Sequence, residues 1–306
     1  MQEKEDSCLQ GEKMQTNLSN ENIIHIQDDK VQYLQFRKLL EYKDIISHAY
    51  SLGTNVNFRT AINGRADVSS TQYKIAKKSY KSICKAIGSK YRNLVKPRQY
   101  HTNNVKIVKN KINVLAPDFN LKKYKETDGL ITNRKNIVLS TTNADCILFL
   151  LFDPAKKVIA NVHSGWKGTL QEIVVQTINK MINEFGCNPK DIICCICPSI
   201  RKCHFEVGQD VKDEFQKQFG ELDGCTYVDE RGNTVTVEMS DIIEEHNGKW
   251  NIDTVLINKI IMQNLGLNPK NIIDSGICSM CNSNLIHSYR NEKEGFGLET
   301  ALIELK

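Results

Sequence analysis

Apolar and polar positions follow two different periods in the centre of this chain. Residues 137–139, 147–152 and 158–162 form short, mostly apolar runs, which is the pattern of buried strands. From Thr169 onward, apolar residues recur every three or four positions as far as Phe185, which predicts an amphipathic helix. Strands and helices that follow one another in this way indicate α/β or α+β layers.

Two further helices are predicted, one over residues 69–91 and one over about residues 252–265. The turn that should join a helix to the next strand occurs twice. The sequence GCNPKDII at residues 186–193 recurs as GLNPKNII at residues 266–273, with six of eight positions identical. In each copy Gly stops the helix and Pro prevents its continuation. We interpret this as an internal duplication of a helix–turn–strand unit; repeated use of one favourable turn is the simpler alternative.

The two ends of the chain differ in character. Residues 1–29 are polar and lack periodicity, so we expect a disordered tail there and one globular domain over residues 30–306. No apolar run approaches the roughly 20 residues that a membrane-spanning helix needs. The first residues also lack the apolar core of a secretory signal. A cytoplasmic protein without a membrane partner is therefore expected.

Charge and cysteine content narrow the class further. The net charge of +5 comes from 41 basic and 36 acidic side chains of interspersed sign. A solvated lysine-rich surface explains this better than a nucleic-acid site, because no nucleic-acid motif accompanies the charges. The eleven cysteines are odd in number and several lie in apolar runs. Reduced thiols in a cytosolic environment are therefore expected.

The most informative chemistry lies in two neighbouring segments. Asp145 and Cys146 lie directly before the apolar run at residues 147–152, and His163 directly follows the run at 158–162. A thiolate and an imidazole are good zinc ligands, and they are also the nucleophile and base of cysteine catalysis. His101 is a third candidate ligand. Three N/S ligands with one vacant position are typical of a catalytic zinc site.

The residues after His163 suggest an anion site. The sequence SGWKGT at residues 164–169 is a glycine-containing turn that opens a helix, where backbone N–H groups favour a negative charge. Lys167 and Gly168 are therefore candidate phosphate contacts. The turn lacks the spacing of a Walker A loop. Asp145 favours a metal beside Cys146, since a carboxylate disfavours a free thiolate.

Two other cysteine groups could bind metal. Cys278 and Cys281 have the C-x-x-C spacing of zinc or redox sites, but one such pair is not specific for either. Cys194, Cys195 and Cys197 lie with Ile residues in a predicted strand, and Cys203 follows shortly after. Alternation along a strand would divide the first three between its two faces, which favours a role in the core.

At these residues the chain resembles the YfiH-type purine nucleoside phosphorylase family, also known as laccase-domain or polyphenol oxidase proteins. The A-D-C and H-x-G-W-x-G motifs are specific. The matching segments span roughly residues 48–305 and are Gln99 with His101, residues 127–132, 142–146, 163–168, 198–200 and 205–208, Cys278, and residues 288–290.

The resemblance implies a zinc ion (Zn2+) held by His101, Cys146 and His163. Arg290, in the matching segment 288–290, is a further candidate for the phosphate or substrate contact. It implies layers related to a cysteine-hydrolase fold, so we expect one domain of mixed sheets flanked by helices in α-β-β-α-like order. The implied activities are phosphorolysis of adenosine, inosine, guanosine and methylthioadenosine, and deamination of adenosine. Copper-dependent phenol oxidation is also claimed for the family, but seven scattered histidines do not favour several coppers.

The chain departs from the family pattern at several positions. Cys197 stands where the family has Gly, and Asn291 and Glu292 replace an Arg and an Asp. Leu298 replaces an Arg, and no Arg closely follows residues 48–51. These departures affect substrate and phosphate contacts rather than the metal ligands.

The resulting hypothesis is a zinc enzyme that acts on purine nucleosides and phosphate. Cys146, His163 and Asp145 are its candidate catalytic residues, with Asp145 as the candidate proton donor. One alternative is a cysteine hydrolase that uses Cys146 as nucleophile and His163 as base. The other is a catalytically inactive relative that binds a partner.

Overall fold

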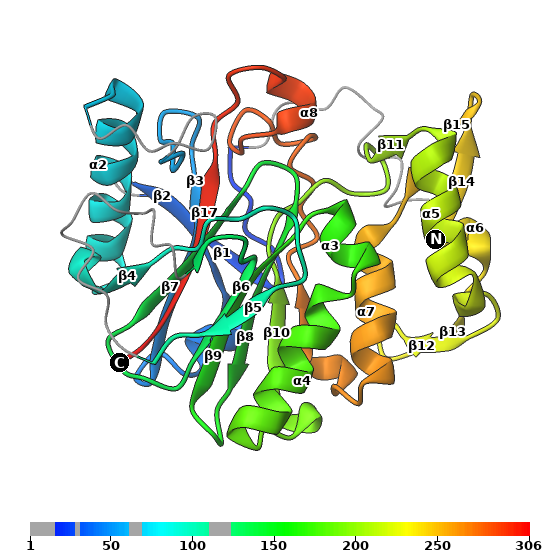
Figure 1. Ribbon diagram of the computed structural model, residues 1–306, viewed down its shortest axis with the longest axis horizontal. Helices are drawn as coiled ribbons and strands as arrows, with labels where there is room; N and C mark the ends of the chain where they lie inside the picture. Colours follow the sequence, from blue (N-terminus) through cyan, green and yellow to red (C-terminus); the bar gives the residue numbers. More distant parts are fainter. Residues whose placement is uncertain (1–15, 28–30, 61–68, 110–123) are drawn as a thin grey trace.

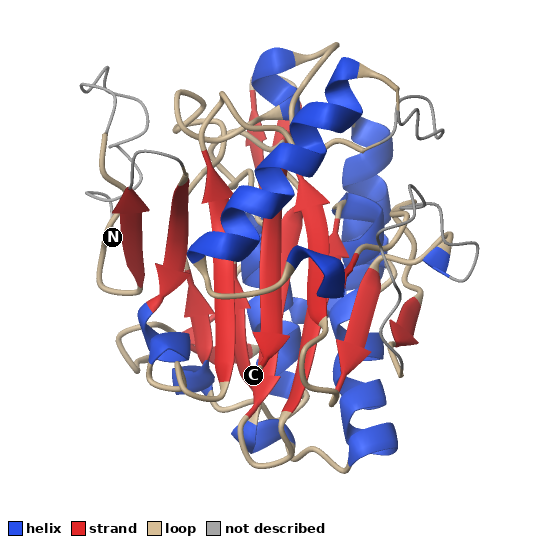
Figure 2. Cartoon of the chain, turned by 90° about the vertical axis from the view of Figure 1, so that its left-hand side faces the viewer, coloured by secondary structure: helices blue, strands red, loops and turns tan. Residues whose placement is uncertain are grey.

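Two six-stranded mixed sheets form the centre of the molecule, and helices cover their outer faces (Figure 1). The structure is a computed structural model that describes residues 16–27, 31–60, 69–109 and 124–306. Helices lie in front of and behind the strands in Figure 2, so the layers follow an α-β-β-α order. The fold class expected from the sequence is confirmed.

The first sheet contains both ends of the described chain. Its pairs are antiparallel except for that between β4 and β7. The strand order is β1 (Ile23–Gln27), β2 (Gln32–Phe36), β3 (Ile46–Leu52), β17 (Glu299–Leu305), β7 (Val138–Asn143) and β4 (Leu94–Val95).

The second sheet carries most of the predicted apolar runs. Its two outer pairs are parallel and its inner pairs antiparallel. The order is β16 (Ile272–Asp274), β10 (Ile193–Ile196), β8 (Ile147–Asp153), β9 (Val158–Ser164), β6 (Gly129–Thr132) and β5 (Val105–Ile107). The predicted runs at 147–152 and 158–162 correspond to β8 and β9.

Three apolar clusters hold the layers together. One lies between the two sheets, a second joins α4 (Ile173–Phe185) and α7 (Thr254–Asn264) to the second sheet, and a third joins α2 (Thr71–Ala86) to the first. No helix in the described part of the chain is long and apolar enough to cross a bilayer. The remaining elements are α1 (Arg37–Leu40), α3 (Trp166–Leu170), α5 (Gln209–Phe219), α6 (Met239–Ile242), α8 (Tyr289–Glu292), β11 (Glu206–Val207), β12 (Thr226–Val228), β13 (Thr234–Thr236), β14 (Ile243–His246), β15 (Lys249–Ile252) and the 3-10 turns η2 (Tyr91–Asn93), η4 (Pro189–Asp191), η5 (Gly220–Leu222) and η6 (Pro269–Asn271).

The helix predicted from Thr169 is two helices. Glu172 adopts a left-handed conformation with φ 53°, which ends α3 and precedes α4. The apolar period continues across this break because α4 packs on the same sheet as the residues before it. Gly186, with φ 66°, ends α4 as expected.

The repeated sequence forms the same structure twice. In both copies a helix ends, a 3-10 turn starts at Pro, and a strand follows. The Asn188 side chain accepts the N–H of Lys190, and Asn268 accepts the N–H of Lys270. The two strands that follow, β10 and β16, pair in parallel. The repeated turn therefore places two similar helix–turn–strand units side by side.

The N-terminal segment corrects one expectation. Residues 1–15 and 28–30 lie outside the described residues, but Ile23–Gln27 form strand β1 and pair with β2. The side-chain amides of Asn20 and Asn22 donate to the carbonyls of Ser275 and Asp274. A tail over all of residues 1–29 is therefore wrong for the described part. The sequence showed no apolar periodicity here because Asn20 and Asn22 attach this segment through hydrogen bonds to the end of β16, and not through apolar contacts.

Acid is expected to weaken the fold through His48. This side chain is 1% exposed in β3, and its Nε2 accepts the N–H of Phe36 at 2.8 Å. Burial lowers the pKa of His48 to about 3, whereas an unfolded chain takes up this proton near its ordinary value. The stabilising contribution of neutral His48 is therefore fully present above its pKa in the unfolded chain. It is lost as the pH falls from there toward its pKa in the folded protein. Between pH 7 and pH 5 the loss is about 2 kcal/mol.

Urea unfolding of wild type and His48→Gln at both pH values measures this loss. The change in the free energy of unfolding between pH 7 and pH 5 should be smaller by about 2 kcal/mol in the variant, because glutamine does not titrate. Equal pH dependence of the two proteins would contradict the assignment.

Candidate functional site

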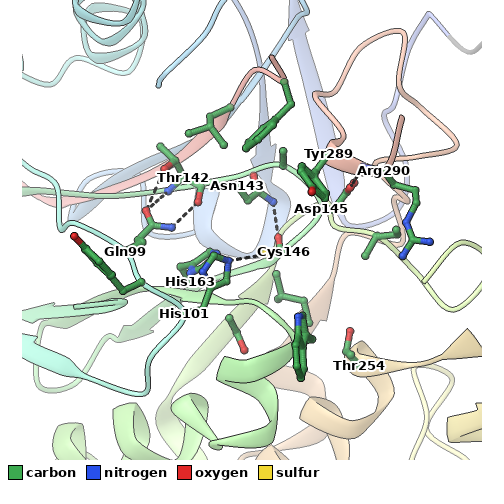
Figure 3. Close-up of a pocket in the computed structure, with 18 of the residues that line it drawn as sticks. Gln99, His101, Thr142, Asn143, Asp145, Cys146, His163, Thr254, Tyr289 and Arg290 are labelled. Carbon is green, nitrogen blue, oxygen red and sulfur yellow. Dashed lines mark hydrogen bonds between the residues drawn. The ribbon is translucent and has the colours of Figure 1, made fainter. Parts of the chain in front are cut away.

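Three side chains from separate elements meet at one end of the sheets. The ligand atoms of His101, Cys146 and His163 all lie within 4.8 Å of one another. His101 follows β4 in a loop, Cys146 lies in the turn between β7 and β8, and His163 is in β9 (Figure 3). Cys146 Sγ is 3.9 Å from His101 Nε2, and the two imidazole centroids are 5.0 Å apart. The structure thus brings together all three residues expected to bind a metal.

A buried carboxylate orients both histidines. Asp128 is fully buried, and its Oδ1 lies 2.9 Å from His163 Nδ1. The same carboxylate accepts the backbone N–H groups of Tyr100, His101 and Thr102. These bonds hold His101 in a left-handed conformation with φ 58°. With Nδ1 bonded to Asp128, the Nε2 of His163 is left to act as a ligand.

The sequence alone assigned no role to Asp128, although it lies in the family segment at residues 127–132. The available signal was an acidic residue directly before an apolar strand. Asp128 is far from His163 along the chain. The two side chains meet only because β6 pairs with β9.

Gly165 leaves the space in which the ligands meet. A Cβ atom at this position would lie 2.6 Å from His101 Cδ2 and 3.1 Å from Cys146 Sγ. The first separation is shorter than real Cβ contacts, so a side chain here must displace His101. Glycine is therefore required by close approach and not by its backbone angle.

Gly165→Ala is expected to lower the metal content of the purified protein, because the added methyl displaces the His101 ring. The fold should survive, since only one loop side chain has to move. Elemental analysis beside a thermal melt measures both properties. Gly88→Ala is not a suitable control because of its positive φ, whereas Gly220→Ala is, since a Cβ there meets only a flexible Gln216 side chain. Full metal content in Gly165→Ala would contradict the account.

The charges of the site suit a cation. Burial disfavours a thiolate at Cys146, but the charge of His163 and hydrogen bonds from both histidines together lower its pKa to about 6. Burial also opposes a charged His163, yet Cys146 and Asp128 raise its pKa to about 9. A thiolate with a carboxylate behind the imidazole places two negative charges near the shared point. The residues therefore fit a divalent metal ion.

The three side chains lie in the wall of a cavity of about 820 Å3, within the range of small-molecule sites. Among the described residues, the cationic side chains that line it are Arg59, Lys96, Arg98 and Arg290. Burial lowers the pKa of Lys96 to about 8. The aromatic residues in the lining are Tyr100, Trp166, Phe205, Tyr289 and Phe296. Cationic and aromatic groups together suit an anionic or planar ligand.

Asp145 and Arg290 both line this cavity and are in contact with each other. Asp145 Oδ2 accepts the backbone N–H of Arg290 at 2.7 Å, and Oδ1 accepts the hydroxyl of Ser279 at 2.6 Å. The guanidinium of Arg290 donates to the carbonyl of Glu206 at 2.8 Å. Asp145 is thus engaged through both carboxylate oxygens, and the Arg290 side chain lies at the edge of the site with its guanidinium bonded to Glu206 (Figure 3).

Lys167 and Gly168 lie outside the lining of this cavity. Lys167 is exposed, with Nζ 5.2 Å from the centroid of the Trp166 ring. Gly168 is buried in α3, a helix of five residues. Their proposed contact with phosphate stays a prediction.

Arg59 was missed by sequence reasoning. The segment after β3 showed no Arg at the expected distance, yet the chain continues to Arg59, which reaches the cavity and stacks 4.7 Å from the Phe296 ring centroid. A cationic group is therefore supplied from further along the same segment. No local signal marks it, because its place depends on the path of the loop.

The family profile described as multi-copper polyphenol oxidoreductase laccase matches residues 54–306. The chain belongs to this family. It is 25% identical over 236 residues to "Purine nucleoside phosphorylase LACC1" of Homo sapiens, covering 76% of this chain and 48% of that protein. It is 27% identical over 209 residues to "Adenosine deaminase RL5" from an unknown prokaryotic organism, covering 68% of this chain and 74% of that protein. The matched region thus spans about half the length of the human relative.

The fold is shared with a solved structure. The crystal structure of the hypothetical protein YfiH of Bacillus licheniformis superposes with a TM-score of 0.74 and 19% sequence identity. The superposition covers 92% of this chain and 99% of the YfiH chain. This likeness concerns the architecture alone. The family profile over residues 54–306 confirms the resemblance inferred from the motifs.

Proposed function

We propose that this chain is a zinc-dependent purine nucleoside phosphorylase that acts on adenosine, inosine, guanosine and methylthioadenosine and also deaminates adenosine. The observation that carries the proposal is the His101, Cys146 and His163 cluster in the wall of a cavity of about 820 Å3. The names of two relatives support the two reactions.

Zinc is the metal that best suits the donor set. One thiolate and two imidazoles, with no fourth protein ligand in the described cluster, match catalytic zinc sites. Clusters able to hold several coppers are not found among the described residues, where the two groups comprise three and four side chains. A bound zinc supplies Lewis acidity and lowers the pKa of water.

The cationic side chains in the lining of the cavity can bind phosphate. Phosphorolysis joins a phosphate oxygen to the sugar carbon while the bond to the purine breaks, and the purine leaves with a proton. Arg290 lines the cavity and donates to the Glu206 carbonyl, and Arg59, Lys96 and Arg98 line the cavity too. Arginine forks suit phosphate oxygens.

The aromatic side chains of Tyr100, Tyr289 and Phe296 offer faces on which a purine can stack. Asp145 stays the candidate that protonates the purine. Its bonds to Ser279 and to the Arg290 backbone also make it a positioning residue for the turn that carries Cys146.

The test is an assay of purified protein with adenosine, with and without phosphate. Adenine and ribose 1-phosphate should form only when phosphate is supplied, and inosine should form in either case. Inosine as the sole product would limit the proposal to deamination. Absence of all three products with zinc-loaded protein would overturn it.

Variants then locate the phosphate. Arg290→Ala is expected to raise the KM for phosphate about tenfold, because a charge-assisted fork is lost. Lys167→Ala is the matched variant, since it removes a cation from outside the cavity. An equal rise in Lys167→Ala would instead support the site expected from the sequence at residues 164–169.

A cysteine hydrolase is the second candidate, and one observation favours it. Cys146, His163 and Asp128 are arranged as nucleophile, base and orienting carboxylate. Metal content separates the two functions. Zinc that protects Cys146 from iodoacetamide supports the phosphorylase, whereas rapid alkylation of Cys146 in zinc-supplied protein supports the hydrolase.

A further inference from the structure

A second group of metal-ligating side chains lies outside the cavity lining. Cys203 and His204 follow β10, and Cys278 and Cys281 follow β16. One atom from each lies within 4.8 Å of every other. The Cys278 and Cys281 pair therefore lies beside Cys203, which the sequence already suggested as a candidate ligand, and beside His204, which it did not.

The parallel pairing of the two similar units explains why the segments after their strands meet. Because β10 and β16 pair in parallel, their carboxyl ends lie at the same edge of the sheet. The chains continue together beyond the strands, where the Ser199 N–H donates to the Ile277 carbonyl and the Ser279 N–H donates to the Ser199 carbonyl. This backbone pairing fixes the positions of the four ligands relative to one another.

The separations match a tetrahedron around one ion. Cys203 Sγ lies 3.7 Å from Cys278 Sγ and 3.8 Å from Cys281 Sγ. His204 Nδ1 lies 3.3, 3.8 and 3.5 Å from the sulfurs of Cys203, Cys278 and Cys281. Ordinary zinc bonds in a tetrahedron separate two sulfurs by about 3.8 Å and a sulfur from a nitrogen by about 3.6 Å.

We propose that Cys203, His204, Cys278 and Cys281 bind one zinc ion as a closed structural site, separate from the site at Cys146. Four protein ligands leave no position for substrate, which is typical of structural zinc. Cys281 is disulfide-bonded in the structure. A ligand must be a thiolate, so the zinc-bound form is that of the chain with Cys281 reduced.

The bound ion would fix the position of residues that line one side of the cavity. Residues 205–208 directly follow His204 and line the cavity. Ser279 lies between the two cysteines of the C-x-x-C motif and donates its hydroxyl to Asp145, next to Cys146. Through these contacts the four-ligand site would position the loop and the turn that carry the proposed catalytic groups.

Metal analysis in the presence of the reductant TCEP tests the proposal. Wild type should contain about two zinc ions per chain, and the Cys278→Ser/Cys281→Ser double variant about one. Cys225→Ser, a partly buried cysteine outside both clusters, should retain both ions. Cys146→Ser should lose only the other ion, so failure of the proposed function and failure of this site give different results. Equal zinc in wild type and the double variant would overturn the proposal.

Cobalt provides a readout that does not depend on the fold of the double variant. Metal-free Cys146→Ser protein, titrated with Co2+ under TCEP, should develop a thiolate-to-cobalt charge-transfer band and the intense visible bands of a tetrahedral site. One equivalent should saturate these bands, and His204→Asn should weaken them. A spectrum of octahedral cobalt without a thiolate band would overturn the proposal.

Discussion

Cys146→Ala is expected to lose the metal at the His101, Cys146 and His163 site and to lower nucleoside turnover about 10³-fold. Two imidazoles alone retain a zinc ion poorly, because the thiolate supplies both charge and the strongest bond. Loss of Lewis acidity costs about 4 kcal/mol of transition-state stabilisation, which corresponds to that factor. Elemental analysis and steady-state assays on one sample measure both effects.

Cys225→Ala serves as the matched control, because that thiol lies outside both metal-ligating clusters. It should keep both metal and turnover. A Cys146→Ala protein that retains zinc at the level of the control would refute the ligand assignment. Loss of zinc with unchanged turnover would support the ligand assignment but would show that the metal takes no part in the reaction.

Asp128→Asn should weaken metal binding and turnover by about 10- to 100-fold, the usual effect of losing the group that orients a ligating histidine. The carboxylate uses one oxygen for His163 and His101 and the other for Thr102. An amide replaces one acceptor oxygen with a donor, so it cannot accept all these bonds. It also removes the charge that favours a basic His163.

Competition with a chromogenic chelator measures the metal affinity of Asp128→Asn, and kcat/KM measures its loss of turnover. Asp153→Asn is the matched control, since Asp153 is also fully buried but lies at the other end of β8 and accepts the N–H of Lys156. Metal affinity should be unchanged there. Equal losses in both variants would mean that general destabilisation, and not the histidine contact, is the cause.

Local patterns determined much of the architecture. The apolar runs of β8 and β9 and the period of α4 are properties of neighbouring residues, and helix and strand geometry follows directly from them. The repeated turn likewise predicted two equivalent units, because Gly and Pro act within a few residues. The sequence motifs also identified His101, Cys146 and His163 as one group.

Only the tertiary structure decided what surrounds that group. The contact of Asp128 with His163, the path that takes Arg59 into the cavity, and the absence of Lys167 from its lining depend on how strands and loops pack. The pairing of β1 with β2, and of β10 with β16, brought in residues 23–27 and joined Cys203 to Cys278. The reason is physical: periodicity and turns act over a few residues, whereas these contacts join side chains far apart in the chain and arise only when the sheets form.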